Sequence, residues 1–258
     1  MEMSTFENDG YRTAAGKASP FAKIVPGLVF YRRMLSIVFR SSALAKHSRY
    51  RTREWVESSF GILEALERAG VILEITGIGH FRDIEGSCVF AGNHMSTLET
   101  FVLPSVIASF KEATFVVKQS LVDYPVFRHV MRSRDPITVG RTNPREDLKA
   151  VMEGGDDRLK RGISVIIFPQ TTRSLTFDPA AFNTIGVKLA KKAGVPLVPI
   201  ALKTDAWGNG KYLKDFGRID PSKKVHIAFG EPLRITGRGT EEHERVIEFI
   251  SGKLKEWS

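Results

Sequence analysis

The feature that most constrains this fold is an almost wholly apolar run, Ile163-Ser164-Val165-Ile166-Ile167-Phe168. Such a run is typical of a strand buried on both faces, as in a parallel sheet covered by helices. Further apolar runs recur at residues 71–75, 87–91, 113–117, 136–139, 195–202 and 225–229. Segments with helical spacing separate most of these runs. We therefore predict an α/β fold with a largely parallel central sheet flanked by helices.

Helix signals fall where this pattern requires them. Apolar residues recur at spacings of three and four over residues 52–69, and Gly70 follows. Asn143-Pro144 is typical of a helix start, with asparagine as the cap and proline in the first turn, and this helix should end near Arg161. Further helices are predicted up to about residue 110 and over residues 121–133, 182–193 and 241–257.

The positive charge of the chain is concentrated near its N-terminus. The net charge is +9, and between Tyr11 and Arg53 there are ten Lys or Arg residues and no Asp or Glu. A basic stretch favours an anionic partner, either nucleic acid or an anionic membrane surface. Large apolar residues alternate with these cations and no nucleic-acid-binding motif is present, so we predict a phospholipid surface as the partner and no nucleic acid.

We expect three segments in the chain. Residues 1–19 should form a loose tail, residues 20–69 basic amphipathic helices at a membrane interface, and residues 70–258 the α/β domain. The run from 20 to 46 is too short and too charged to cross ~30 Å of hydrocarbon, so it should lie in the interface or, alternatively, pack on the protein's own core. The single cysteine, Cys88, excludes an intramolecular disulfide and favours a reducing compartment. The expected location is the cytoplasmic face of a membrane, peripheral or monotopic.

Polar residues at the ends of predicted strands form the candidate site. His94 follows the strand at 87–91, and Glu99 lies five residues further on. A carboxylate that fixes the tautomer of a neutral histidine makes it a general base. Because five residues in an ideal helix separate side chains by about 140°, the two can meet only if His94 precedes the helix. Alternatively, Ser96 to Glu99 is only a capping box, with the glutamate bound to helix-start amides.

Two more strand ends carry arginines. Arg141 follows the strand at 136–139, and Arg173 lies in the polar stretch after Phe168. Two arginines at adjacent strand ends would converge on a phosphate, which arginine binds in a bidentate manner. Either arginine could instead be a surface residue. Gln170 and Thr172 could contact a substrate or shape the turn.

Taken together, four segments resemble the motifs of the glycerolipid acyltransferase superfamily, which contains the PlsC-type 1-acylglycerol-3-phosphate acyltransferases. They are His94-Met95-Ser96-Thr97-Leu98-Glu99, Ile137-Thr138-Val139-Gly140-Arg141, Phe168-Pro169-Gln170-Thr171-Thr172-Arg173-Ser174 and Val195-Pro196-Leu197-Val198-Pro199-Ile200. The resemblance covers about residues 70–235. Two departures stand out: Glu99 replaces the family's usual aspartate, and Gln170-Thr171 replaces its usual Glu-Gly pair.

The resemblance implies an O-acyltransferase of phospholipid biosynthesis with His94 and Glu99 as its catalytic pair. Arg141, Gln170, Thr171, Thr172 and Arg173 would bind the acceptor, a lysophospholipid such as 1-acylglycerol-3-phosphate. The donor would be acyl-CoA or acyl carrier protein, with no bound cofactor and no metal. The altered third motif leaves open a different lysolipid acceptor, such as an aminolipid. A non-catalytic lipid-binding protein is the remaining alternative.

Overall fold

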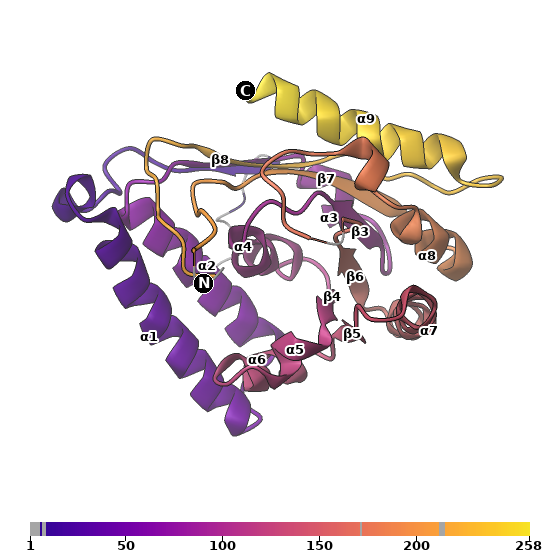
Figure 1. Cartoon of the computed structure of the whole chain (residues 1–258), viewed down its shortest axis with the longest axis horizontal. Coiled ribbons are helices and arrows are strands. Elements are labelled where there is room, and N and C mark those ends of the chain that lie inside the picture. Colours follow the sequence, from indigo (N-terminus) through magenta and orange to yellow (C-terminus); the bar gives the residue numbers. More distant parts are fainter. Residues whose placement is uncertain (1–5, 7–8, 171, 212–214) are drawn as a thin grey trace.

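A computed structural model of the chain describes residues 6, 9–170, 172–211 and 215–258. Its centre is one eight-stranded sheet with the strand order β1-β2-β8-β7-β3-β6-β4-β5 (Figure 1). The β1–β2 and β7–β8 pairs are antiparallel, and the other neighbouring pairs are parallel. The predicted α/β class with a largely parallel sheet is therefore confirmed.

The strands are β1 Gly10–Arg12, β2 Leu73–Thr76, β3 Val89–Gly92, β4 Ala113–Lys118, β5 Ile137–Val139, β6 Ser164–Ile167, β7 Leu197–Lys203 and β8 Val225–Phe229. All of them except β1 fall within about two residues of the predicted apolar runs. Every residue of the neighbouring strands β3 and β6 is buried. The apolar run at residues 163–168 thus lies near the middle of the sheet, where both faces are covered.

Helices cover both faces of this sheet. They are α1 Pro26–Lys46, α2 Thr52–Arg68, α3 Gly79–Arg82, α4 Leu98–Ile107, α5 Gln119–Asp123, α6 Phe127–Ser133, α7 Pro144–Lys160, α8 Ile185–Ala193 and α9 Thr240–Glu256, with short 3-10 turns at Pro20–Lys23 and Pro179–Ala181. Helices α7, α8 and α9 lie on one side, and α1, α2 and α4 lie on the other with the α5–α6 pair (Figure 1). Each side encloses its own apolar core.

The predicted loose tail is wrong for residues 10–12. These residues form strand β1, which pairs with β2 through Tyr11 and Ile75, because β2 would otherwise leave an unpaired sheet edge. The Tyr11 hydroxyl also donates a hydrogen bond of 2.6 Å to the buried carboxylate of Glu67. Lys17 Nζ lies 2.8 Å from the same carboxylate, so this segment is tied to α2. Residues 1–5 and 7–8 of the predicted tail lie outside the described residues.

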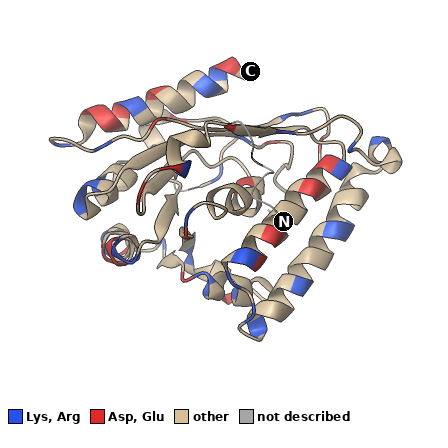
Figure 2. Cartoon of the chain, turned by 180° about the vertical axis from the view of Figure 1, so that it is seen from behind, with Lys and Arg blue, Asp and Glu red and all other residues tan. Residues whose placement is uncertain are grey.

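Helix α1 has two different faces. Phe30, Met34 and Val38 are buried against the core, as the alternative of a core-packed helix required. The opposite face exposes large apolar side chains, with Leu28 67% and Phe39 58% exposed. Its charged residues are all Lys or Arg, whereas the neighbouring α2 carries both signs (Figure 2). None of the helices in the described part of the chain is long and apolar enough to cross a bilayer.

Candidate active site

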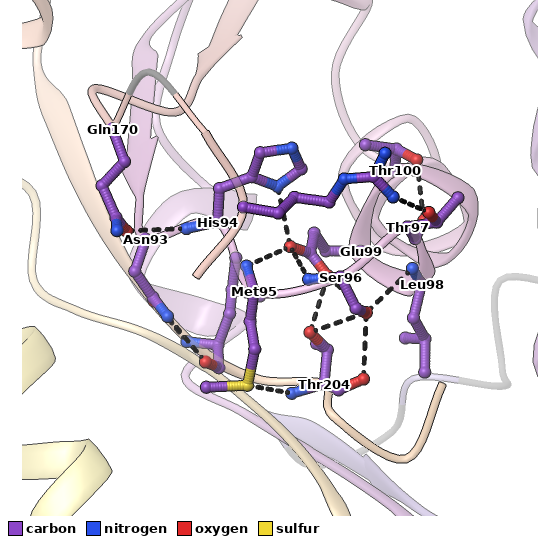
Figure 3. Close-up of polar contacts among 12 residues, drawn as sticks. Asn93, His94, Met95, Ser96, Thr97, Leu98, Glu99, Thr100, Gln170 and Thr204 are labelled. Atoms are coloured by element: carbon purple, nitrogen blue, oxygen red, sulfur yellow. Dashed lines mark hydrogen bonds and ion pairs between the residues drawn. The ribbon is translucent and has the colours of Figure 1, made fainter. Parts of the chain in front are cut away.

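The loop between β3 and α4 fixes the backbone of His94. Asn93 extends the β3–β7 ladder with its side chain: its Nδ2 donates to the Leu202 carbonyl at 2.8 Å, and its Oδ1 accepts from the Leu202 amide at 2.9 Å. The amide of His94 donates to Gln170 Oε1 at 2.9 Å (Figure 3), and its carbonyl accepts from the Ser174 amide at 2.9 Å. The backbone at His94 is therefore fixed by contacts with β7, through Asn93, and by contacts with the loop that follows β6.

The side chains of His94 and Glu99 meet directly. His94 Nδ1 lies 2.8 Å from Glu99 Oε1, and α4 begins only at Leu98, so the histidine precedes the helix as the five-residue spacing required (Figure 3). The same oxygen accepts the amides of Met95 at 2.7 Å and Ser96 at 2.9 Å. The two interpretations of Glu99 thus hold together, because one oxygen both caps the helix start and contacts the imidazole.

Glu99 is built to remain ionised. Desolvation by complete burial would raise the pKa of its carboxyl group. The hydrogen bond and charge interaction with His94 and the hydrogen bonds from Thr204 and Ser96 outweigh this effect, so the pKa lies below its ordinary value. A carboxylate at this position keeps the proton of a neutral His94 on Nδ1, which leaves the lone pair of Nε2 free to accept a proton.

Phe168 fixes the plane of the imidazole, a role that the sequence did not reveal. Its ring stacks on His94 with the centroids 4.4 Å apart and the planes 5° apart. Phe168 stacks in turn on Phe115 of β4, at 6.2 Å between centroids. Because Glu99 holds one ring nitrogen and Phe168 covers one face, the imidazole has a single orientation.

An apolar pocket of about 190 Å³ begins at His94. It is bounded by α1, α2, α4, β4 and the α5–α6 pair. Its apolar wall includes Ile37, Ile62, Phe101, Phe115, Phe127 and Met131. His94, Thr97, Arg173 and Asp215 supply polar groups to its lining. His94 thus stands beside a cavity suited to a hydrocarbon chain.

The structure separates the two arginines that the sequence placed at adjacent strand ends. Strand β4 lies between β5, which leads to Arg141, and β6, which leads to Arg173, so that expectation is wrong. Arg173 lines the pocket and donates to Thr97 Oγ1 and, at 2.8 Å, to Asp215 Oδ1. Arg141 is exposed, has φ 61°, and binds Asp147 through its backbone amide at 2.9 Å. The sequence could not show this, because strand order depends on pairing between distant segments.

The other predicted substrate-binding residues occupy different positions. Gln170 is only 5% exposed, and its side-chain oxygen supports the backbone of His94. Thr172 is exposed, and Thr171 lies outside the described residues. Contact of these three residues with a substrate stays a prediction.

Thr204 is a part of the site that the sequence analysis missed. It lies just after β7, is fully buried, and donates to Glu99 Oε2 at 2.6 Å (Figure 3). Because β7 runs parallel to β3 as its neighbour, both strands end at the same edge of the sheet. The rule that selected the other strand ends would also have selected Thr204, a polar residue just beyond the apolar run at 195–202.

Known proteins resemble this chain along most of its length. A family model described as Acyltransferase matches residues 72–203. The 1-acyl-sn-glycerol-3-phosphate acyltransferase of Pseudomonas aeruginosa is 28% identical over 226 residues, which cover 85% of this chain and 83% of that protein. The chloroplastic enzyme BAT2 of Brassica napus is 32% identical over 143 residues, 54% of this chain and 38% of that protein. The crystal structure of the Thermotoga maritima LPA acyltransferase PlsC superposes with a TM-score of 0.65 at 21% identity, covering 91% of this chain and 97% of that one.

Proposed function

This chain belongs to the acyltransferase family, and from that premise we propose that it moves a fatty acyl group from a thioester to the hydroxyl of a lysophospholipid in phospholipid biosynthesis. The thioester is acyl-CoA or acyl carrier protein, and the first acceptor to consider is 1-acylglycerol-3-phosphate. The observation that carries the proposal is the 2.8 Å contact of His94 with the buried Glu99 at the start of an apolar pocket.

The chemistry follows from the free Nε2 of His94. An alcohol is a poor nucleophile at neutral pH, so Nε2 takes the proton of the acceptor hydroxyl as its oxygen attacks the thioester carbonyl. Glu99 stabilises the imidazolium that forms. When the tetrahedral intermediate collapses, the carbon–sulfur bond breaks and the imidazolium returns the proton to the departing sulfur. The products are the acylated lipid and a free thiol.

Arg173 would hold the acceptor phosphate near His94. Its side chain is 22% exposed, and its two bonds to Thr97 and Asp215 leave further guanidinium N–H groups for a phosphate. The pocket would take an acyl chain, since its wall is apolar. Arg141 lies beyond β4, so its contact with a phosphate requires a substrate that reaches across that strand end.

One observation favours a second class of acceptor. The carboxylate of Asp215 lines the same pocket and pairs with Arg173, which gives the site a negative group beside the positive one. An acceptor that carries both a phosphate and an ammonium group, or an aminolipid, would complement this pair. The reaction with such an acceptor would still be acyl transfer to a hydroxyl.

The test of this function is product formation with a panel of acceptors. The purified chain is given radiolabelled acyl-CoA or acyl carrier protein together with lysophosphatidate, lysophosphatidylethanolamine or an aminolipid, and the lipids are separated by thin-layer chromatography. Labelled phosphatidate supports the first acceptor. Turnover only with an ammonium-bearing acceptor supports the second. Lipid binding without any labelled product would make the chain a lipid-binding protein instead.

We also propose that the exposed face of α1 lies on an anionic membrane, at its cytoplasmic side. Leu28, Leu35 and Phe39 recur on one face of this helix with Arg32 between them, the arrangement of an interfacial helix. Leu28→Glu combined with Phe39→Glu should lower binding to phosphatidylglycerol vesicles at least tenfold, because each change puts a carboxylate where an apolar side chain would meet lipid. Binding is measured by vesicle sedimentation.

The matched control is Leu148→Glu, at an exposed leucine of α7 on the other side of the sheet. This change should leave vesicle binding within twofold of the unchanged chain. Equal loss in the control would attribute the effect to added negative charge, and full binding by the double variant would remove α1 from the membrane contact.

A further inference from the structure

Thr204 contacts the half of the Glu99 carboxylate that does not face His94. Its Oγ1 donates to Oε2 at 2.6 Å, and the Ser96 hydroxyl lies 3.1 Å from the same oxygen. The Ser96 hydroxyl also lies 2.9 Å from the Thr204 carbonyl, so the two residues brace each other. All three residues are completely buried.

The two oxygens of Glu99 differ in their closest partners. Oε1 faces His94 and the amides of Met95 and Ser96, while Oε2 accepts from Thr204 at 2.6 Å and has longer contacts with the Ser96 hydroxyl at 3.1 Å and the Ser96 amide at 3.2 Å. The terminal torsion of a glutamate is soft, so a carboxylate held at one oxygen alone can turn about its last bond. Donation from Thr204 is the shortest of the contacts that hold the second oxygen, and it thereby contributes most to fixing the direction in which Oε1 points.

The position of Thr204 is itself fixed by the sheet. The double hydrogen bond between Asn93 and Leu202 locks the end of β7 against the loop that carries His94. The amide of Thr204 donates to Met95 Sδ at 3.3 Å. The threonine hydroxyl is thus delivered by a rigid strand end, which is the arrangement that precise positioning of a functional group requires.

We propose that Thr204 is a positioning residue for the His94–Glu99 pair and that it is matched to the length of Glu99. The glutamate is one methylene longer than aspartate, and its second oxygen reaches the Thr204 hydroxyl. A shortened carboxylate could not hold His94 and Thr204 together. This inference rests on the proposed acyl transfer, because it concerns the residues that would take the proton.

Thr204→Val tests the hydroxyl with little change in volume, and Thr204→Ser is its matched control because it keeps the donor. We expect Thr204→Val to lower kcat about tenfold with KM within twofold, as for other partners that orient a functional side chain. Thr204→Ser should stay within about threefold of the unchanged enzyme. A kcat above half of the original in Thr204→Val, or an equal loss in both variants, would overturn the proposal.

A double-mutant cycle with Glu99→Asp tests the matching. If aspartate cannot reach Thr204, adding Thr204→Val to Glu99→Asp should lower kcat by less than a further twofold. Losses that multiply, so that the double variant falls by the product of both single effects, would show that the two residues act independently and would contradict the match.

A third measurement needs no turnover and so separates this inference from the proposed function. The ¹⁵N shifts of the His94 imidazole report which ring nitrogen carries the proton. Without the Thr204 donor the Glu99 carboxylate can turn away from Nδ1, so the population of the Nδ1–H tautomer should fall in Thr204→Val and not in Thr204→Ser. Arg134, Arg173 and Asp215, the other charged groups in the pocket lining, are unchanged in both variants. An unaltered tautomer in Thr204→Val would refute the positioning role even if no acyl transfer is found.

Discussion

Replacing His94 with alanine is expected to lower kcat for acyl transfer about a thousandfold, within the range known for loss of a general base. His94 lines the pocket, while Glu99 holds one nitrogen of its imidazole and Phe168 covers one face of the ring. The fold should survive, because Asn93, Gln170 and Ser174 hold the loop through the side chain of Asn93 and the backbone of His94. Steady-state kinetics and thermal unfolding together check both statements.

The matched control is His129→Ala. His129 lies on α6 and does not contribute to the described lining of the pocket. This variant should keep kcat within twofold of the unchanged enzyme. Acyl transfer that persists in folded His94→Ala would show that His94 is not the base and would reopen the interpretation of the chain as a lipid-binding protein.

Glu99→Gln is expected to lower kcat about a hundredfold. The amide has the shape of the carboxylate but no charge, so it cannot stabilise the imidazolium that forms as the hydroxyl loses its proton. The KM for the acceptor should change less than twofold, because Glu99 is completely buried and cannot touch the lipid. A variant with full kcat would reduce Glu99 to the helix-capping role that its contacts with Met95 and Ser96 also support.

The stability of Glu99→Gln should also depend on pH differently from that of the unchanged chain. The pKa of Glu99 in the folded chain lies below its ordinary value, so its carboxylate stabilises the fold above the unfolded pKa of ~4.3. That contribution is lost as the pH falls through the lower, folded pKa. The free energy of unfolding should therefore differ between the unchanged chain and Glu99→Gln at neutral pH, and the difference should shrink below about pH 4. Urea unfolding at several pH values measures this, and a difference independent of pH would contradict it.

Local patterns in the sequence predicted most of the fold. The Asn143-Pro144 helix start is confirmed, with Asn143 Oδ1 accepting the Arg145 amide at 3.1 Å. The apolar run ending at Phe168 is the buried strand β6, and the polar residues after it do lie beside His94. These features were readable because capping and burial periodicity depend on residues only a few positions apart.

The amphipathic segment at residues 20–46 shows what a local pattern cannot predict. Its apolar and basic spacing predicted helix α1, but the spacing fits both a core-packed helix and an interfacial one. The structure shows Phe30 and Met34 buried while Leu28 stays exposed on the opposite face. Only the position of α2 and the sheet could decide which of the apolar residues are covered.

By itself, the sequence predicted the α/β class, most of the helices and strands in their order, and the pairing of His94 with Glu99, because each rests on short spacings. The tertiary structure alone decided that β4 separates Arg141 from Arg173, that Phe168 stacks on His94, and that Thr204 holds Glu99. Thr204 and Glu99 are 105 residues apart in the chain. Their contact depends on which strands become neighbours, and that choice is made by packing of the whole sheet, which no local spacing records.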